Sequence, residues 1–259
     1  MEGVGKLMSR IKLSEEEKKV VKIRGSAKEK GKNTDPRAIG KLLSEKPAHP
    51  DAISLSLGCV WCPIKGIDCT EVGDYVFMFT FKQESGKRKA LEDGPWMFDK
   101  ELMVVENYDP GKRIEDYEFN DIPIWVRIFS LPLGMMNEEA AEDIGNTIGK
   151  FVEADAGADG KAIGKFLRVK VRMTIEKPIM RGFTLEEEEE DQHKQEQKKK
   201  MAIYNTVEEV EEGQWCRFEY EFMPDFCYTC GLIGHGEKDC TIKLKKGERP
   251  QFGSWLKRM

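Results

Sequence analysis

The feature that most constrains this chain is a group of four potential metal ligands within fourteen residues, Cys227, Cys230, His235 and Cys240. Their spacing is C-x2-C-x4-H-x4-C, and three thiols with one imidazole can form a complete tetrahedral shell around Zn²⁺. Fourteen residues cannot bury a hydrophobic core, so the metal must supply the folding free energy, about 10–16 kcal/mol in small sites of this kind. Because protein atoms fill all four positions, we expect a structural zinc ion rather than one that activates water.

The residues between these ligands indicate what the motif binds. Gly231 and Gly234 stand where a side chain would crowd the turn of the backbone around the ion. Tyr228 offers a ring on which an unpaired base can stack, a contact of about 1–3 kcal/mol. The motif resembles the CCHC zinc knuckle of retroviral and retrotransposon nucleocapsid proteins, which implies binding of single-stranded RNA or DNA. No second aromatic residue stands between His235 and Cys240, which argues against strong base readout by the knuckle alone, and a purely scaffolding zinc clip is the alternative.

Charge is distributed unevenly, although the net charge of the 259 residues is only −5. Residues 1–46 carry 13 Lys and Arg against 7 Asp and Glu, and residues 241–259 carry 6 against 1. Residues 186–212 carry 4 against 11. Because phosphate binding depends on the local field, two basic ends are compatible with a nucleic-acid binder. For the first end, the alternative is that its charges only solubilise a tail.

Composition and motifs exclude several classes of protein. No apolar run approaches the roughly 18 residues of a membrane span, and the first residues lack the apolar segment of a signal peptide. We therefore expect no membrane partner and no secretion, with residence in the nucleus or cytoplasm, where the seven cysteines serve as thiols and metal ligands. No nucleophile motif or distinctive carboxylate pair is present, so we expect neither catalysis nor a small-molecule substrate.

Hydrophobic patterning from residue 38 onward alternates between strand and helix periods. It predicts strands at 38–44, 66–72, 75–81 and 102–107, with helices beginning at Pro50 and spanning 84–93. The order β-α-β-β-α-β predicts an α+β fold of the ferredoxin-like, RNA-recognition-like type. Tyr75, Phe77, Phe79 and Phe81 invite comparison with a base-stacking strand. Four aromatic residues on one side of a strand are nevertheless more typical of a core.

A second β-α-β-β segment extends this sandwich before the zinc knuckle. It has strands at 124–129, 151–155 and 166–175 and a helix capped by Asn137, and a strand at 216–222 leads into the knuckle. The predicted domains are a flexible basic arm (1–37), the ferredoxin-like domain (38–110), the second α+β segment (111–185), a charged low-complexity insert (186–212), a lead-in strand (213–224), the knuckle (225–242) and a basic tail (243–259).

Two of these strands have one side that is both aromatic and basic. Trp125, Arg127 and Phe129 alternate with aliphatic residues, and Arg168, Lys170 and Arg172 do the same in the strand 165–173. An open sheet with rings among cations can hold splayed bases and phosphates. The alternative is that the rings pack under another element and the cations only keep the face soluble. The candidate nucleic-acid contacts are therefore Trp125, Arg127, Arg168, Lys170 and Arg172 in the sheet, Tyr228 in the knuckle, and Lys243, Lys245, Lys246 and Arg249 in the tail.

Several segments beyond the knuckle resemble one plant family. They are Val76–Phe81, Ala90–Phe98, Ile122–Arg127, Leu131–Leu133, Tyr220–Cys240 and Phe252–Leu256. Together they resemble proteins that pair a domain of unknown function (DUF4283) with a CCHC knuckle, in open reading frames of LINE-type, non-LTR retrotransposons and in derived host genes. The resemblance covers residues 38–255 and implies nucleic-acid binding and an RNA-recognition-like fold, without an agreed catalytic activity. The acidic insert departs from the family pattern.

We therefore expect a non-catalytic, zinc-dependent protein of retrotransposon type that binds single-stranded RNA or DNA. Self-association stays open. One alternative is a protein-interaction adaptor that uses the knuckle and the acidic insert, and it predicts that loss of the Tyr228 ring leaves nucleic-acid binding unchanged. The other is a metal-dependent nuclease that uses scattered carboxylates with Mg²⁺.

Overall fold

The computed structural model describes residues 14–20, 35–44, 46–185, 213–245 and 247–258. The chain divides into two units, Met1–Thr34 and Asp35–Met259. In the first unit, residues 14–20 form a turn in which the Ser14 N–H donates to Glu17 Oε2 at 2.7 Å. The predicted insert 186–212 and most of the predicted arm lie outside the described residues. All helices and strands described below belong to the second unit.

The first sheet of this unit has the strand order β2-β3-β1-β5-β4, and all neighbouring strands are antiparallel. Its elements are β1 (Arg37–Leu43), α2 (Pro50–Trp61), β2 (Ile67–Gly73), β3 (Val76–Phe81), α3 (Glu84–Glu92), β4 (Trp96–Phe98) and β5 (Glu101–Asn107). The predicted strands and helices of this part are all present, with bounds that differ by one residue. The short edge strand β4 is an addition that hydrophobic patterning did not reveal.

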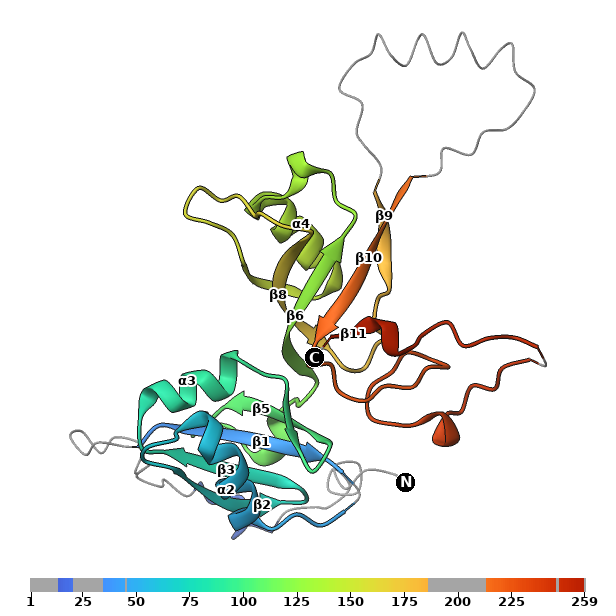
Figure 1. Ribbon diagram of the computed structural model, residues 1–259. Coiled ribbons are helices and arrows are strands. Elements are labelled where there is room, and N and C mark those ends of the chain that lie inside the picture. Colours follow the sequence, from blue (N-terminus) through green and yellow to red (C-terminus); the bar gives the residue numbers. More distant parts are fainter. Residues whose placement is uncertain (1–13, 21–34, 45, 186–212, 246, 259) are drawn as a thin grey trace, which may run out of the picture. The chain divides into compact units, whose positions relative to one another are not determined.

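Helices α2 and α3 pack on one face of the first sheet (Figure 1). Phe77, Phe79 and Phe81 of β3 point to this face and are completely buried, and the Trp61 ring of α2 meets the Phe79 ring edge-on at 5.0 Å between centroids. Tyr75 is partly buried against the same cluster. The prediction that these aromatic residues belong to the core is confirmed.

The second sheet has the strand order β11-β10-β6-β8-β7, with β9 also paired to β10. Its elements are β6 (Asp121–Phe129), α4 (Glu138–Ile148), β7 (Lys150–Ala154), β8 (Phe166–Thr174), β9 (Gly182–Leu185), β10 (Gln214–Glu221) and β11 (Lys257–Arg258). Asn137 caps α4 as predicted, because its Oδ1 accepts from the Ala140 N–H at 2.9 Å. Short 3₁₀ helices span Ile114–Asp116, Leu133–Met135, Glu237–Asp239 and Ser254–Leu256.

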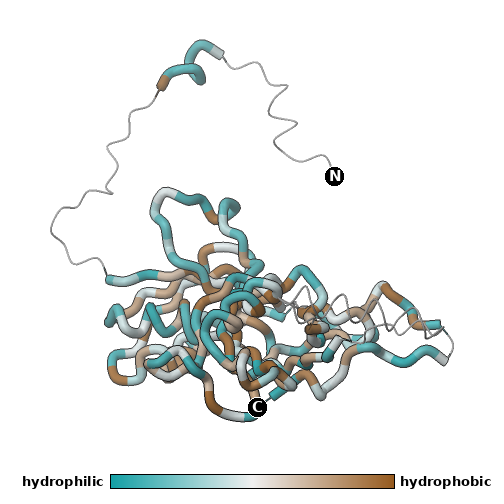
Figure 2. Tube along the Cα trace, turned by 90° about the horizontal axis from the view of Figure 1, so that it is seen from above, coloured by the Kyte–Doolittle hydropathy of each residue, from teal (hydrophilic) through white to brown (hydrophobic). Residues whose placement is uncertain are grey.

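One large hydrophobic cluster joins the second sheet to the first. Its centre is formed by Ile124, Val126 and Ile128 of β6 with Leu167, Val169 and Val171 of β8, beneath Ala141 and Ile144 of α4. The face of the first sheet that lacks helices contributes Ile39, Val76, Leu102 and Val104 to the same cluster. Both faces of the first sheet therefore carry buried apolar residues. Figure 2 shows short hydrophobic and hydrophilic stretches intermixed along the chain of this unit.

The aromatic and charged side chains of β6 and β8 lie on the face that points away from the large hydrophobic cluster. Because strand side chains alternate, the aliphatic face of β6 and β8 lies on the cluster and the other face carries rings and charges. We call this second side, made by Trp125, Arg127 and Phe129 of β6, Phe166, Arg168 and Lys170 of β8, and Arg217, Glu219 and Glu221 of β10, the outer face. Among the described residues, no helix has the length and apolar character of a membrane span.

Candidate metal centre and nucleic-acid interface

The four predicted metal ligands come together in the structure. One ligand atom from each of Cys227, Cys230, His235 and Cys240 lies within 4.8 Å of all the others, and Cys230 Sγ is 3.2 Å from His235 Nε2. The three thiols are buried and the imidazole is partly buried. In a tetrahedral shell, sulfur lies about 2.3 Å and nitrogen about 2.0 Å from zinc, so ligand atoms at these separations can enclose one ion. The donor set and the geometry both fit Zn²⁺.

Two glycines in the left-handed region shape the loop between the ligands. Gly231 has φ +78° and its N–H donates to the Cys227 carbonyl at 2.8 Å, while Gly234 has φ +94°. The predicted tight turns at both positions are confirmed. The crowding expected for a side chain at both positions is found only at Gly231, where a Cβ would lie 2.5 Å from the Phe252 ring. At Gly234 the expectation is wrong, since a Cβ there would meet nothing within 4 Å.

The two cysteines of the first pair differ in acidity. Burial raises the pKa of Cys227, but N–H groups of Cys230 and Thr229 and the neighbouring thiols donate to its sulfur, so its pKa is held below the usual value. At Cys230 burial prevails and raises the pKa to about 11. Of these two thiols, Cys227 is therefore the better prepared to bind as a thiolate, and the charge of a bound ion favours the deprotonation of Cys230.

Hydrogen bonds and apolar contacts attach the knuckle to the second sheet. The Ile179 N–H donates to the Gly231 carbonyl at 3.0 Å, and the Phe252 N–H donates to the Tyr228 carbonyl at 3.3 Å. Phe226 and Ile233, which form an isolated β-bridge around the first ligand pair, belong to the large hydrophobic cluster. The metal loop is therefore packed on the sheet. Loss of the metal should accordingly destabilise the residues that follow the loop as well.

Tyr228 lies beside the metal site at the edge of a cleft. Its ring is partly exposed and lies 5.3 Å from the Phe226 ring, centroid to centroid, at an angle of 56°. The cleft has a volume of about 1220 Å³, and Met97 of β4 and Lys100 of the β4–β5 turn line it together with Tyr228 and His235. Sequence reasoning missed Met97 and Lys100, because residues so far from the knuckle in the chain carry no local sign of lying next to it.

Three cations of the basic tail are exposed to solvent. Lys243, Lys245 and Arg249 are exposed, and among the described residues none of their side chains forms an ion pair. Lys246 lies outside the described residues. The three described cations are therefore accessible to phosphates.

The cations of the outer face lie over aromatic rings. The Arg168 guanidinium is 3.8 Å from the centroid of the Trp125 ring, and the Lys170 amine is 5.3 Å from the same ring. The Arg127 guanidinium is 4.7 Å from the Phe166 centroid. The predicted alternation of an aliphatic side with an aromatic and basic side is confirmed for both strands, with the difference that Lys170 is buried.

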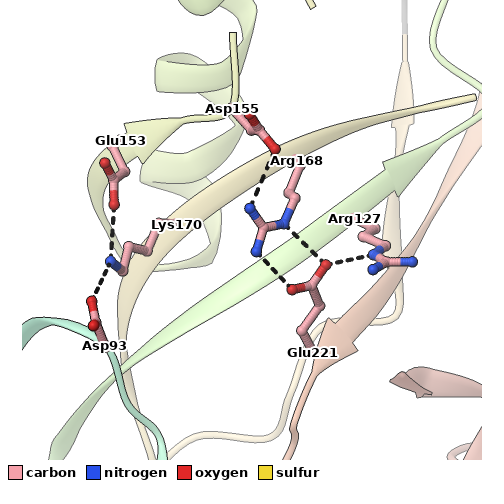
Figure 3. Close-up of polar contacts among 7 residues, drawn as sticks. All are labelled: Asp93, Arg127, Glu153, Asp155, Arg168, Lys170 and Glu221. Carbon is pink, nitrogen blue, oxygen red and sulfur yellow. Dashed lines mark hydrogen bonds and ion pairs between the residues drawn. The ribbon is translucent and has the colours of Figure 1, made fainter. Parts of the chain in front are cut away.

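These cations also have acidic partners that sequence reasoning did not identify (Figure 3). Glu221 at the end of β10 accepts from Arg127 Nε at 2.6 Å and from Arg168 Nε and Nη2 at 3.0 and 2.9 Å. Burial raises the pKa of Glu221, but the hydrogen bonds from Arg168 and Arg127 outweigh it and hold the pKa below its usual value. Glu221 is therefore a charged carboxylate fixed between two guanidinium groups.

The remaining sheet candidates are paired in the same way. Lys170 Nζ lies 2.9 Å from Glu153 and 3.7 Å from Asp93, and Arg168 also reaches Asp155 at 3.3 Å. Arg172 pairs with Glu106 of β5. The structure thus brings Trp125, Arg127, Arg168 and Lys170 together on one face, where the cations are not free. Their role as nucleic-acid contacts stays a prediction.

Comparison with protein families matches two parts of the chain. Residues 39–116 match a family described as a domain of unknown function (DUF4283), and residues 208–242 match a family described as a zinc knuckle. The chain therefore pairs these two domains, as the sequence predicts. No curated protein sequence matches the chain.

Three solved structures show a distant likeness. The RNA-binding domain of Hrp1 in complex with RNA is 12% identical, covers 53% of this chain and 81% of its own, and has a TM-score of 0.26. A Sxl-lethal protein/RNA complex is 14% identical over 71% of this chain and 98% of its own, with a TM-score of 0.24. The first two RRM domains of the yeast poly(U)-binding protein Pub1 are 8% identical over the same shares, with a TM-score of 0.21.

Proposed function

We propose that this chain is a non-catalytic, zinc-dependent protein of the plant retrotransposon type that binds single-stranded RNA or DNA. The observation that carries the proposal is the knuckle, where four zinc ligands converge beside the partly exposed ring of Tyr228. The unpaired cations of the tail follow within a few residues. The pairing of a DUF4283 domain with a zinc knuckle supports the retrotransposon type.

We propose that the first sheet with α2 and α3 is a ferredoxin-like, RNA-recognition-like unit. The strand order β2-β3-β1-β5 and the two helices on one face support this assignment. RNA-recognition sheets stack bases on aromatic residues of the face without helices. Here that face carries Ile39, Val76, Leu102 and Val104, which are buried in the large cluster. The nucleic-acid surface of this protein therefore lies elsewhere, in the knuckle, its tail and the outer face.

The knuckle and its tail make different contacts in this proposal. A bound zinc ion would fix the loop from Cys227 to Cys240 and thereby the position of the Tyr228 ring. The ring would stack one base, while Lys243, Lys245 and Arg249 would neutralise neighbouring phosphates. Each neutralised phosphate lowers log K by about 0.7 per tenfold increase in salt, so binding through this surface depends strongly on salt.

Replacing Tyr228 by alanine tests the stacking role. We expect affinity for a labelled single-stranded oligonucleotide to fall by about five- to hundredfold, since base stacking on a ring contributes about 1–3 kcal/mol. Tyr228→Phe keeps the ring and should bind like the unchanged protein. Fluorescence anisotropy titrations of both variants, each with zinc content verified, provide the measurement. Unchanged binding by Tyr228→Ala would favour the protein-interaction adaptor.

The absence of catalysis is tested separately. Incubation of the purified protein with labelled RNA and DNA in the presence of Mg²⁺ should leave both substrates intact. Cleavage that follows the protein through purification and is lost on removal of Mg²⁺ would establish the nuclease alternative instead.

A further inference from the structure

Glu221 has an unusual place among the charges of the outer face. Its side chain is only 6% exposed, whereas the side chains of its partners Arg127 and Arg168 are 24% and 28% exposed. The carboxylate thus lies deeper than the guanidinium groups that bind it. The two arginines keep a side that faces solvent, where a ligand could reach them.

The geometry of this contact is the one that guanidinium groups use for phosphate. Arg168 binds both oxygens of Glu221 with two parallel hydrogen bonds of 3.0 and 2.9 Å, and Arg127 adds a third of 2.6 Å. Carboxylate and phosphate both present two oxygens at a spacing that fits the planar fork of arginine. A backbone phosphate could therefore replace Glu221 without any change in the type of contact.

Aromatic rings hold both guanidinium groups in place independently of Glu221. Arg168 lies over Trp125 at 3.8 Å and Arg127 over Phe166 at 4.7 Å. Stacking on a ring restricts the orientation of a guanidinium and costs it none of its hydrogen-bond donors. Because the arginines are already positioned, a phosphate that displaced Glu221 would meet little further entropic cost.

The other acids of the outer face compete more weakly. Asp155, Glu153 and Asp93 have side chains that are 62%, 52% and 51% exposed. Exposed ion pairs contribute about 0–1 kcal/mol and are screened by salt, so these carboxylates yield readily to a ligand. Glu219 is 14% exposed, but it pairs with Arg217. Glu221 is therefore the shielded acid that decides whether Arg127 and Arg168 are available.

The position of Glu221 in the chain connects this site to the knuckle. It is the last residue of β10 and stands six residues before Cys227, a span of at most about 20 Å even when fully extended. A single strand held at the knuckle would therefore present its neighbouring phosphates to the outer face at high local concentration.

We propose that Glu221 occupies the place of a nucleic-acid phosphate between Arg127 and Arg168 and so keeps the outer face in a self-neutralised state of low affinity. The backbone of a single strand competes with Glu221 for the two guanidinium groups. This inference rests on the proposed function and assigns to the outer face a ligand class, the phosphodiester backbone, and to Glu221 the control of its affinity. A carboxylate that only clamped the strands together would have the opposite consequence, since its removal would weaken the fold and leave binding unimproved.

Glu221→Gln is the direct test, carried out on the full chain with zinc. We expect about tenfold tighter binding of a labelled single-stranded oligonucleotide in anisotropy titrations, the gain of one to two charge-assisted contacts. The slope of log K against log salt should steepen by about 1.4, because two phosphates are newly neutralised. Glu142→Gln on α4 is the matched control, since it removes one exposed carboxylate away from the outer face and should change affinity less than about twofold.

A second variant keeps the test decisive if Glu221→Gln fails to fold. Glu221→Asp keeps the charge but shortens the side chain by one methylene, so it should loosen the contact with Arg127 and Arg168 and tighten binding by about threefold, a gain that vanishes when Arg168 is also replaced by glutamine. Folded Glu221→Gln that shows no gain overturns the proposal, as does folded Glu221→Asp without a gain where Glu221→Gln does not fold. Both variants are compared with the unchanged protein, which must bind the oligonucleotide in a zinc-dependent way. If the unchanged protein binds no oligonucleotide, it is the proposed function that is refuted.

Discussion

Replacement of Cys227 by serine is expected to abolish stoichiometric zinc binding and to unfold the loop up to Cys240. Cys227 is completely buried, and N–H groups of Cys230 and Thr229 donate to its sulfur, so the replacement removes a ligand that the backbone around it holds in place. The loss removes most of the roughly 10–16 kcal/mol with which zinc stabilises a small site. A chromogenic chelator titration should find less than one tightly bound zinc ion per chain.

The effect should extend beyond the metal loop. The Phe252 N–H donates to the Tyr228 carbonyl, so the segment that leads into β11 depends on the knuckle, while the Phe222 N–H and the pairing with β10 hold β11 itself. Hydrogen exchange should therefore accelerate from Phe222 to Arg258, while β3 and β5 keep their protection. Cys59→Ser is the control, because Cys59 is exposed on α2 and outside the site. A Cys227→Ser protein that retains one tightly bound zinc ion would contradict the assignment of the ligands.

Gly231→Ala is the second change with a large expected effect. At φ +78° an alanine is strained by about 1–2 kcal/mol, and its Cβ would lie 2.5 Å from the Phe252 ring, which must move. Displacing a packed ring adds about 1–3 kcal/mol. Because the knuckle folds on binding the metal, this cost appears as a loss of zinc affinity of at least about thirtyfold in competition with a calibrated chelator.

The chain offers a matched control for the steric part of this effect. Gly234 has φ +94°, but no atom lies within 4 Å of the position that a Cβ would take there, so Gly234→Ala carries the backbone strain alone. We expect Gly234→Ala to lose less affinity than Gly231→Ala, and Phe252→Ala to restore part of the loss when combined with Gly231→Ala. Equal losses in the two glycine variants, with no recovery in the double variant, would show that the Phe252 contact is unimportant.

Local features of this molecule were predictable from its sequence because their causes are local. The zinc ligands lie within fourteen residues, so their spacing alone brings them together. The helix cap at Asn137 depends on a hydrogen bond to a residue three positions away. Strands such as β6 and β8 are long enough for the alternation of aliphatic residues with aromatic and charged ones to show. By contrast, β4, β9 and β11 have two to four residues each, which are too few for the two-residue period of a strand to be recognised in the sequence.

The acidic partners on the outer face could not be predicted in this way. Glu221 lies 94 residues from Arg127 and 53 from Arg168, and its own strand shows only that it alternates with apolar neighbours. The position of Lys170 on the polar side of β8 predicts exposure, yet Glu153 and Asp93 pair with it and it is buried. Strand alternation gives the face on which a residue lies but not its partners, which depend on sheet order and register.

This distinction matters for the interpretation of basic faces. On the sequence alone, the cations of the outer face and those of the tail looked equally available to phosphates. The structure separates them, since Arg127, Arg168 and Lys170 are paired with carboxylates while Lys243, Lys245 and Arg249 are exposed. Salt-dependent binding in the unchanged protein should therefore come chiefly from the knuckle and its tail.

Zinc dependence of single-strand binding is the most direct test of the proposed function. Anisotropy titrations of labelled single-stranded RNA and DNA with the full chain would be made with zinc and after chelation, each at two salt concentrations. We predict that chelation lowers affinity by at least about tenfold, because the Tyr228 ring loses its fixed position. We also predict that higher salt weakens the zinc-loaded complex, because it screens the phosphate contacts. Affinity that neither chelation nor salt alters would contradict the account.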